Sequence, residues 1–231
     1  MFQPKETTPV VTSEVDASSS TSSEAAPGKR EKFVPEERST VDAILTAPST
    51  ANPEFPPYSV ISKGPIYNLR LYDIYPIVEM NYERRGDGYA SLGSYFDGQN
   101  SGLVKFAYTQ PVFMRYEPDG RKSMAMFIGS RRGVGQGVEK LTGAVEQLPL
   151  PDDKQVRIGV AGAELVAVHI FEGNITPGSA EAARLRLVAA LAADGIQLAD
   201  DEAAGAFRCG QYGAVYQLGG RLNEMLLKVK M

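Results

Sequence analysis

Cysteine, histidine and tryptophan are scarce in this chain of 231 residues, which has one cysteine, Cys209, one histidine, His169, and no tryptophan. A single cysteine excludes a disulfide bond within the chain, so nothing indicates a disulfide-stabilised secreted scaffold. One cysteine and one histidine also cannot supply the four ligands of a structural zinc site or an iron–sulfur cluster. We interpret Cys209 as a small buried hydrophobic residue.

The chain also lacks a surplus of positive charge and a long hydrophobic run. It has 24 Lys and Arg against 28 Asp and Glu, and its pI is about 5.2. Proteins that bind nucleic acids usually carry clustered basic residues, so we exclude a nucleic-acid partner. The longest apolar candidate, Leu187–Ala193, is much shorter than the roughly 20 residues of a transmembrane helix. Since the N-terminus also lacks the apolar region of a secretory signal, we expect a soluble intracellular protein.

The first 57 residues have the composition of a disordered tail that ends in a linker. Ser18–Ser23 is a low-complexity run, and several prolines interrupt any helical pattern. Val41–Leu45 is a short apolar exception that could dock on the domain or on a partner protein. Asn52–Pro57 is typical of a stiff, extended linker. We therefore predict a tail and linker over residues 1–57 and one folded domain over residues 58–231.

The domain shows the same order of elements twice. In its first part we expect strands over 58–63, 66–75, 76–82, 103–108 and 123–128, with a helix marked by the stripe Tyr89, Leu92 and Phe96 and closed by Gly98. In its second part we expect strands over 156–160, 164–171, 214–218 and 223–230, with a helix from Thr176–Pro177 to Gly195. A strand pair, a helix and a strand pair, repeated, predict an α+β fold of two pseudo-equivalent halves around one core.

No pattern in the sequence indicates catalysis. No nucleophile lies at a spacing that would place it beside a base, and no pair of acids is placed for acid–base chemistry. Glu172 and Glu224 are the two acids of most interest, and both are interpreted as surface or strand-end residues. The glycine-rich stretch Arg131–Gly137 lacks the Gly-Lys-Ser/Thr ending of a phosphate-binding loop, so we interpret it as a flexible loop.

Five short segments resemble the SOUL/haem-binding-protein family in their order and spacing. They are YNLRLY at 67–72, YASLGSYFDGQN at 89–100, TQPV at 109–112, VHIFEG at 168–173 and GRLNEM at 220–225. The resemblance covers 58–230, which is nearly the whole domain. It implies a distorted antiparallel β-barrel with two helices, built from two pseudo-symmetric halves, which agrees with the pattern of elements.

The resemblance also implies binding of haem or a related tetrapyrrole in a shallow cleft between the first helix and a late loop, Gln211–Tyr216. By position, the cofactor-binding residues would be Leu92, Tyr95 and Phe96 on the floor, Tyr212, Val215 and Tyr216 in the loop, and Arg70 and Lys105 as partners of the propionates. A macrocycle needs an apolar floor, aromatic edges and cations of this kind. The alternative interpretation of the floor stripe, from periodicity alone, is packing against the core.

Two departures from the family pattern affect the ligand. The family's late loop carries prolines, whereas Tyr212 is followed here by Gly213–Val215, so we expect a looser cleft wall. The family's closing Arg-Arg-Asn-Glu-Val-Trp is replaced by residues 221–226, RLNEML. His169 alternates onto a strand face with Leu165 and Phe171, which is typical of a packed imidazole. We therefore expect haem, if bound, to lack a histidine ligand.

Three functions follow as hypotheses. The first is a non-catalytic tetrapyrrole carrier or buffer. The second is an interaction subunit that docks on a larger assembly through its tail and barrel surface without haem. The third, an enzyme of tetrapyrrole metabolism, has no catalytic pattern to support it. The resemblance alone suggests a plastid, with the cytoplasm as the alternative.

Overall fold

The structure, a computed structural model, describes residues 53–132, 148–213 and 221–231. The elements of the first part are β1 (Tyr58–Lys63), β2 (Asn68–Tyr72), β3 (Tyr75–Asn81), α2 (Arg85–Phe96), β4 (Val112–Tyr116) and β5 (Lys122–Phe127). Those of the second part are β6 (Arg157–Ala161), β7 (Glu164–Glu172), α3 (Pro177–Ala193), α4 (Asp200–Ala203), β8 (Phe207–Gln211) and β9 (Leu222–Lys228).

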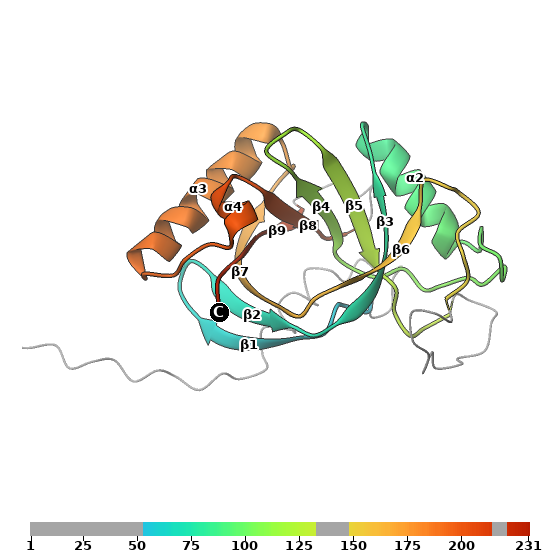
Figure 1. Cartoon of the computed structure of the whole chain (residues 1–231), viewed down its shortest axis with the longest axis horizontal. Helices are drawn as coiled ribbons and strands as arrows, with labels where there is room; N and C mark the ends of the chain where they lie inside the picture. Colours follow the sequence, from blue (N-terminus) through green and yellow to red (C-terminus); the bar gives the residue numbers. More distant parts are fainter. Residues whose placement is uncertain (1–52, 133–147, 214–220) are drawn as a thin grey trace, which may run out of the picture. The chain divides into compact units, whose positions relative to one another are not determined.

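The nine described strands form one curled antiparallel sheet in the order β1-β2-β7-β9-β8-β4-β5-β3-β6 (Figure 1). Without β1, this order is symmetric about the β8–β4 pair. One unit consists of β2-β3-α2-β4-β5 and the other of β6-β7-α3-β8-β9. The first strand of each unit pairs with a strand of the other unit, because β2 pairs with β7 and β6 pairs with β3. The sheet is open between β1 and β6, so it is a half-barrel. The prediction of a distorted α+β barrel built from two halves is confirmed.

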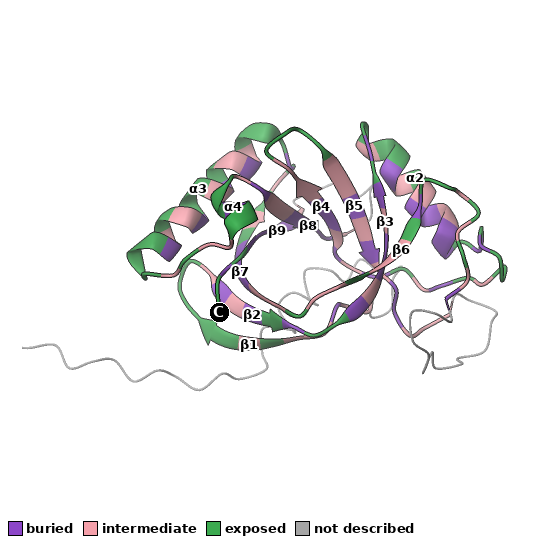
Figure 2. Ribbon diagram, in the orientation of Figure 1, coloured by how far each residue is buried: buried purple, intermediate pink, exposed green. Residues whose placement is uncertain are grey.

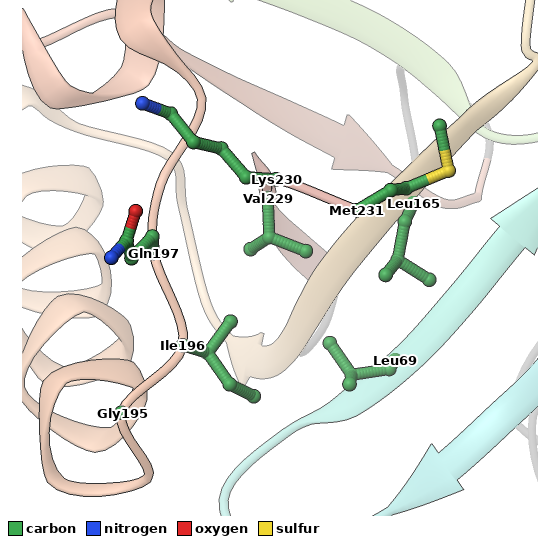
Figure 3. A pocket seen from close by; sticks show the side chains of 8 residues that line it. All are labelled: Leu69, Leu165, Gly195, Ile196, Gln197, Val229, Lys230 and Met231. Atoms are coloured by element: carbon green, nitrogen blue, oxygen red, sulfur yellow. The ribbon is translucent and has the colours of Figure 1, made fainter.

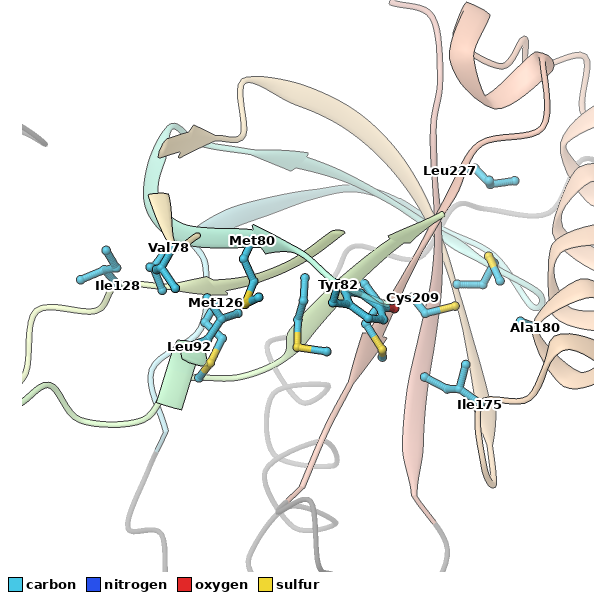
Figure 4. Packing of buried hydrophobic residues seen from close by; sticks show 14 of the residues in the cluster. Val78, Met80, Tyr82, Leu92, Met126, Ile128, Ile175, Ala180, Cys209 and Leu227 are labelled. Atoms are coloured by element: carbon cyan, nitrogen blue, oxygen red, sulfur yellow. The ribbon is translucent and has the colours of Figure 1, made fainter. Parts of the chain in front are cut away.

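The two long helices cover equivalent positions on one face of this sheet. Helix α2 packs on β3 and β5, and α3 packs on β7 and β9. Figure 2 shows buried residues on α2 and α3 where they face the sheet. Their side chains join those of the sheet in the main core, which includes Leu92, Ala180, Met126, Cys209 and Leu227 (Figure 4). We call this side the helix-covered face.

No helix of the described residues packs on the opposite face, which we call the helix-free face, and it carries a second core without members from the described helices. Its buried members are Tyr72, Tyr75, Ile77, Phe113, Val166, Val168 and Leu226. Buried charges lie beside them, since Arg70 is 4% exposed and Glu224 is 1% exposed. Central strands such as β9 are thus buried on both sides, which hides the alternation that a one-sided strand shows.

Both predicted long helices are confirmed, and both are followed by a glycine at which the chain turns away. Thr176 accepts a hydrogen bond from the Ser179 N–H, and the Ser179 side chain accepts one from the Thr176 N–H, so α3 begins with a capping box and Pro177. The chain turns away after each helix at a glycine with positive φ, Gly98 at 99° and Gly195 at 70°.

Some predicted strands differ from the structure. Residues 103–108 form no strand, because the Asn100 side chain bonds to the Tyr95 and Val104 backbone and holds a turn there. Strands β4 and β8 were not predicted. Strand β8 (FRCGQ) mixes a charge, a cysteine and a glycine, so its period is hidden. The predicted strand over 214–218 lies outside the described residues.

The end of the predicted linker is attached to the domain. The carboxylate of Glu54 accepts hydrogen bonds from the Ser130 N–H at 3.0 Å, the Ser130 hydroxyl at 2.7 Å and the Arg131 N–H at 2.9 Å. The Glu54 carbonyl also accepts from the Gln110 N–H, and Phe55 packs on Tyr212. Residues 53–57 therefore belong with the domain, while the predicted tail over residues 1–52 lies outside the described residues.

Candidate functional site

Helix α2 meets the start of the late loop through one hydrogen bond. The Tyr89 hydroxyl, on the N-terminal half of the helix, lies 2.5 Å from the amide oxygen of Gln211 and donates to it. Gln211 is the last residue of β8, directly before the loop. The first helix is therefore a neighbour of Gln211, and Tyr89 makes that contact.

Two guanidinium groups lie close to this contact. Arg85 donates to the Ile175 carbonyl at 2.9 Å and to the Tyr116 hydroxyl at 2.9 Å, which fixes it between α2, β4 and the entry to α3. Burial raises the pKa of Tyr89, while the positive charges of Arg85 and Arg221 act to lower that pKa. The site thus has a half-buried phenol, an amide and two cations, the groups that suit the carboxylate end of a ligand.

The three predicted floor residues lie on the side of α2 that packs on the sheet. Leu92 and Phe96 are 0% exposed and Tyr95 is 1% exposed. The Tyr95 ring stacks on Phe106 with centroids 5.4 Å apart, and its hydroxyl donates to the Pro149 carbonyl at 3.0 Å. A macrocycle could touch these residues only by displacing them from the core, so their role in binding stays a prediction.

Arg70 lies on the helix-free face and already has a carboxylate partner. Its Nη1 donates to Glu224 Oε1 at 2.8 Å, and its guanidinium lies 4.5 Å from the centre of the Tyr58 ring. Glu224 is therefore a buried ion-pair partner, which corrects its interpretation as a surface or strand-end residue. A propionate would have to replace Glu224 to reach Arg70.

The remaining predicted residues are dispersed. Tyr212 is buried on the helix-free face, where burial and then the charge of Glu224 raise its pKa well above the ordinary value. Lys105 is exposed and lies beside Gly98, after the end of α2. Val215 and Tyr216 lie outside the described residues.

His169 lies on β7, on the helix-covered face with Leu165, Ala167 and Phe171. The side chain is 8% exposed, and its Nδ1 lies 2.6 Å from the Ile66 carbonyl oxygen. Because a carbonyl only accepts, Nδ1 carries the hydrogen in this contact. The imidazole is thus packed on the second half of the sheet, as its alternation predicted.

The sequence profile of the SOUL heme-binding protein family matches residues 53–228. The chain belongs to this family. The match begins at the segment that Glu54 attaches to the domain, so the family domain starts before the predicted boundary at residue 58. None of the curated protein sequences matches the chain.

Several solved structures are similar to this SOUL domain at low identity. The C-terminal domain of EcmrR is 12% identical, with 75% of this chain and 98% of that chain covered and a TM-score of 0.47. A hydrolase from Listeria innocua is 9% identical, with 85% and 97% covered and a TM-score of 0.44. An uncharacterized conserved protein from Listeria innocua is 8% identical, with 84% and 98% covered and a TM-score of 0.47. These values carry no argument about function.

A separate shallow pocket of about 380 Å³ lies between β2, β7, the segment after α3 and the C-terminus of the SOUL domain (Figure 3). Leu69, Leu165, Ile196, Val229 and Met231 give it an apolar wall. It contains none of the residues predicted for the ligand. Among the described residues, no helix is long and apolar enough to cross a membrane.

Sequence reasoning missed Arg85 as a residue of the candidate site, included Gln211 only as the first residue of the late loop, and assigned Tyr89 only to the helical stripe. Tyr89 differs from Leu92 and Phe96 in carrying a hydroxyl, so it can lie at the edge of the buried stripe with its polar end directed to a partner. The hydroxyl was therefore the feature of the sequence that could have assigned Tyr89 to the candidate site. The contact of Gln211 with the helix gave no signal, because strand β8, which Gln211 ends, was not predicted.

Proposed function

We propose that the protein binds haem or a related tetrapyrrole as a non-catalytic carrier or buffer. Membership of the SOUL heme-binding family over residues 53–228 supports this class of ligand. The observation that carries the choice of site is the hydrogen bond between Tyr89 and Gln211, which joins the first helix to the late loop. The ligand would lie over this contact rather than over the buried side of α2.

The residues around the contact fit the carboxylate end of a tetrapyrrole. Arg85 and Arg221 supply positive charge near Tyr89, and guanidinium groups form strong charge-assisted hydrogen bonds with carboxylates. The Tyr89 ring supplies an aromatic surface that is partly accessible. When bound, haem would supply iron and its visible absorption; the chain's own residues would bind the propionates and orient the ring.

A haemin titration of the full chain tests the proposal. We expect a saturable change in the Soret band at one equivalent. Tyr89→Ala should weaken that binding, because it removes the aromatic surface and the contact with Gln211. Tyr108→Ala is the matched control, since Tyr108 is a partly exposed tyrosine whose hydroxyl lies 3.4 Å from the Gly93 carbonyl oxygen on the same helix. Melting curves on both variants would test whether they are folded.

His169→Ala tests whether the imidazole is the iron ligand, independently of where haem binds. We expect the Soret band and the affinity to stay nearly unchanged, because His169 lies on β7 with Nδ1 bonded to the Ile66 carbonyl. A folded His169→Ala variant with a shifted Soret band would make the imidazole the iron ligand. No Soret change in the wild-type protein would contradict tetrapyrrole binding, and recovery of the protein in a stoichiometric complex would then favour the docking function.

A further inference from the structure

The segment TQPV at 109–112, one of the five that resemble the family, connects the core to the end of β8. Its first residue, Thr109, is 2% exposed, and its hydroxyl donates a hydrogen bond to the Phe127 carbonyl at 2.5 Å. Its last residue, Val112, is opposite Gln211 in the pairing of β4 with β8. The segment is therefore fixed in the core at one end, and at its other end it lies beside the residue that contacts α2.

The late loop begins with three described residues, which we call the loop base: Gln211, Tyr212 and Gly213. Each of the three has a partner on a different segment. Gln211 contacts α2, and the Tyr212 ring packs on Phe55 with centroids 6.2 Å apart. The Gly213 N–H donates to the side-chain oxygen of Gln110 at 3.2 Å. The loop base is thus held at once by the first helix, the segment before β1 and the TQPV segment.

Gln110 connects the loop base to the segment before β1. Its N–H donates to the Glu54 carbonyl at 3.0 Å, while its side-chain oxygen accepts from Gly213. Glu54 is held in turn by Ser130 and Arg131, which donate to its carboxylate. Gln110 therefore has a fixed backbone, and its side chain is the part that reaches the loop base.

The position of Gly213 explains why the loop base needs this side chain. The Tyr212 N–H still bonds across the sheet to the Leu222 carbonyl. Gly213 follows the last paired residue of β8 and has a positive φ of 86°, so the chain turns there. A buried or half-buried N–H at such a turn needs an acceptor from outside the ladder. The amide oxygen of Gln110 supplies it, since a glutamine oxygen only accepts.

We propose that Gln110 is a positioning residue of the tetrapyrrole site. This role rests on the proposed function, because the ligand would lie over the contact of Tyr89 with Gln211. Gln110 acts through the loop base: by holding Gly213, it fixes the direction in which the chain leaves β8, and so it keeps the Gln211 amide where the Tyr89 hydroxyl donates to it.

The first experiment is a haemin titration of full-length Gln110→Leu and Gln110→Glu, followed by the Soret band. Leucine is of similar size but accepts no hydrogen bond, whereas glutamate keeps an accepting oxygen. We expect Gln110→Leu to weaken haemin binding about 5-fold, which corresponds to the loss of one hydrogen bond worth about 1 kcal/mol. Gln110→Glu should restore most of the affinity. Gln155→Leu, at an exposed glutamine, is the matched control and should bind like the wild type.

A double-variant cycle with Tyr89→Phe tests the route of the effect. Tyr89→Phe keeps the ring and removes the hydroxyl that donates to Gln211. If Gln110 acts through this contact, Gln110→Leu/Tyr89→Phe should bind haemin about as weakly as the weaker single variant, because both changes remove the same interaction. Affinity losses that multiply would overturn the positioning role, since a merely structural effect of Gln110 does not depend on the Tyr89 hydroxyl.

Amide hydrogen exchange of the ligand-free protein separates the role of Gln110 from the proposed function. We expect faster exchange at Gln211 and Tyr212 in Gln110→Leu and wild-type exchange in Gln110→Glu. Unchanged exchange in Gln110→Leu would overturn the role of Gln110. If the wild type and Gln110→Leu bind haemin equally, the positioning role is wrong and the proposed function stands. If the wild type shows no Soret change, the proposed function is wrong and the positioning role fails with it, even where exchange shows that Gln110 holds the loop base.

Discussion

The two halves of the domain have the same order of strands and helices but stabilise their helices differently. Helix α3 in the second half has 17 residues, a capping box at Thr176 and Pro177 in its first turn. Helix α2 in the first half has 12 residues, and its N-cap residue, Arg84, makes no side-chain capping bond. The shared topology therefore does not require shared local signals. Helix α3 begins at a signal of its own sequence, whereas α2 depends on its packing against β3 and β5.

Glycine makes this dependence of α2 stronger. The helix contains Gly86, Gly88 and Gly93, and glycine lowers helix stability by roughly 1 kcal/mol relative to alanine at each interior position. At Gly88 a close approach explains the choice, because a Cβ there would lie 3.0 Å from Met124 Sδ. The first helix is thus fitted to the sheet, and its half-buried Tyr89 contacts Gln211 at the end of β8.

The first half also carries elements that the second half lacks. Strand β1 stands outside the symmetric order, and residues 53–57 precede it. Arg70 on β2 then pairs with Glu224 on β9, which belongs to the second half. Because the first strands are exchanged, this ion pair connects the two halves on the helix-free face. Three predictions test, one by one, the ion pair, the attachment of residues 53–57 and the starts of the two helices.

The largest effect is expected from Glu224→Ala, which leaves Arg70 buried without its carboxylate. Breaking a buried pair by removing one partner costs about 3–5 kcal/mol of unfolding free energy. Both partners are nearly inaccessible here, at 4% and 1% side-chain exposure, so solvent cannot replace the lost charge. Urea denaturation followed by circular dichroism measures the change.

The control is the double variant Arg70→Met/Glu224→Leu, which removes both charges and keeps most of the volume. We expect it to recover a large part of the stability lost in Glu224→Ala, because replacing both members of a buried pair by apolar groups is often neutral or stabilising. A Glu224→Ala variant as stable as the wild type would show that the ion pair does not hold the halves together.

The sequence predicted the features that repeat and missed those that join the halves. Periodicity and caps located both long helices, and the repeated order indicated two halves. The exchange of β2 and β6 is a long-range pairing that no local pattern encodes. Strand β8 shows no apolar alternation in the sequence, because a charged residue, Arg208, and a glycine, Gly210, occupy its positions on the helix-free face. The ion pair of Arg70 and Glu224 depends on that pairing, so sequence reasoning took Arg70 as a ligand residue and Glu224 as a strand end.

The candidate site was predictable only in outline. The family resemblance placed it between the first helix and the late loop, which stays a prediction, and the structure adds the contact of Tyr89 with Gln211 at the end of β8. The helical stripe could not say which face of α2 is covered, because packing and ligand binding give the same apolar period. Burial of Leu92 and Phe96 at 0% exposure decides that they pack against the sheet in this structure.

A smaller effect is expected from Glu54→Gln, which weakens the attachment of residues 53–57. Its carboxylate accepts from the Ser130 hydroxyl and from the Ser130 and Arg131 N–H groups. Losing the charge on this partly exposed group should cost about 1 kcal/mol at neutral pH. Thermal melting measures it, and Glu83→Gln, at a side chain that is 96% exposed, is the matched control with no expected change.

The pH dependence of this effect has a definite sign. Burial acts to raise the pKa of Glu54, but the hydrogen bonds from Ser130 and Arg131 outweigh it and lower that pKa below its ordinary 4.5. The stabilisation is therefore complete above pH 4.5 and is lost as the pH falls through the lowered pKa. The difference in melting temperature between wild type and Glu54→Gln should shrink on acidification. A difference that grows there would contradict the role of the carboxylate.

The smallest effect is expected at the helix starts, where the two halves differ most clearly. Thr176→Ala removes the side chain that accepts a hydrogen bond from the Ser179 N–H at 3.1 Å. Loss of such a cap costs about 1 kcal/mol of unfolding free energy. Arg84→Ala removes a side chain that caps nothing and only forms a surface pair with Asp87. That pair contributes at most a few tenths of a kcal/mol. Paired urea titrations should therefore show a lower midpoint for Thr176→Ala and an unchanged one for Arg84→Ala. Equal shifts in the two variants would mean that α3, like α2, is held by packing alone, and the contrast between the halves would disappear.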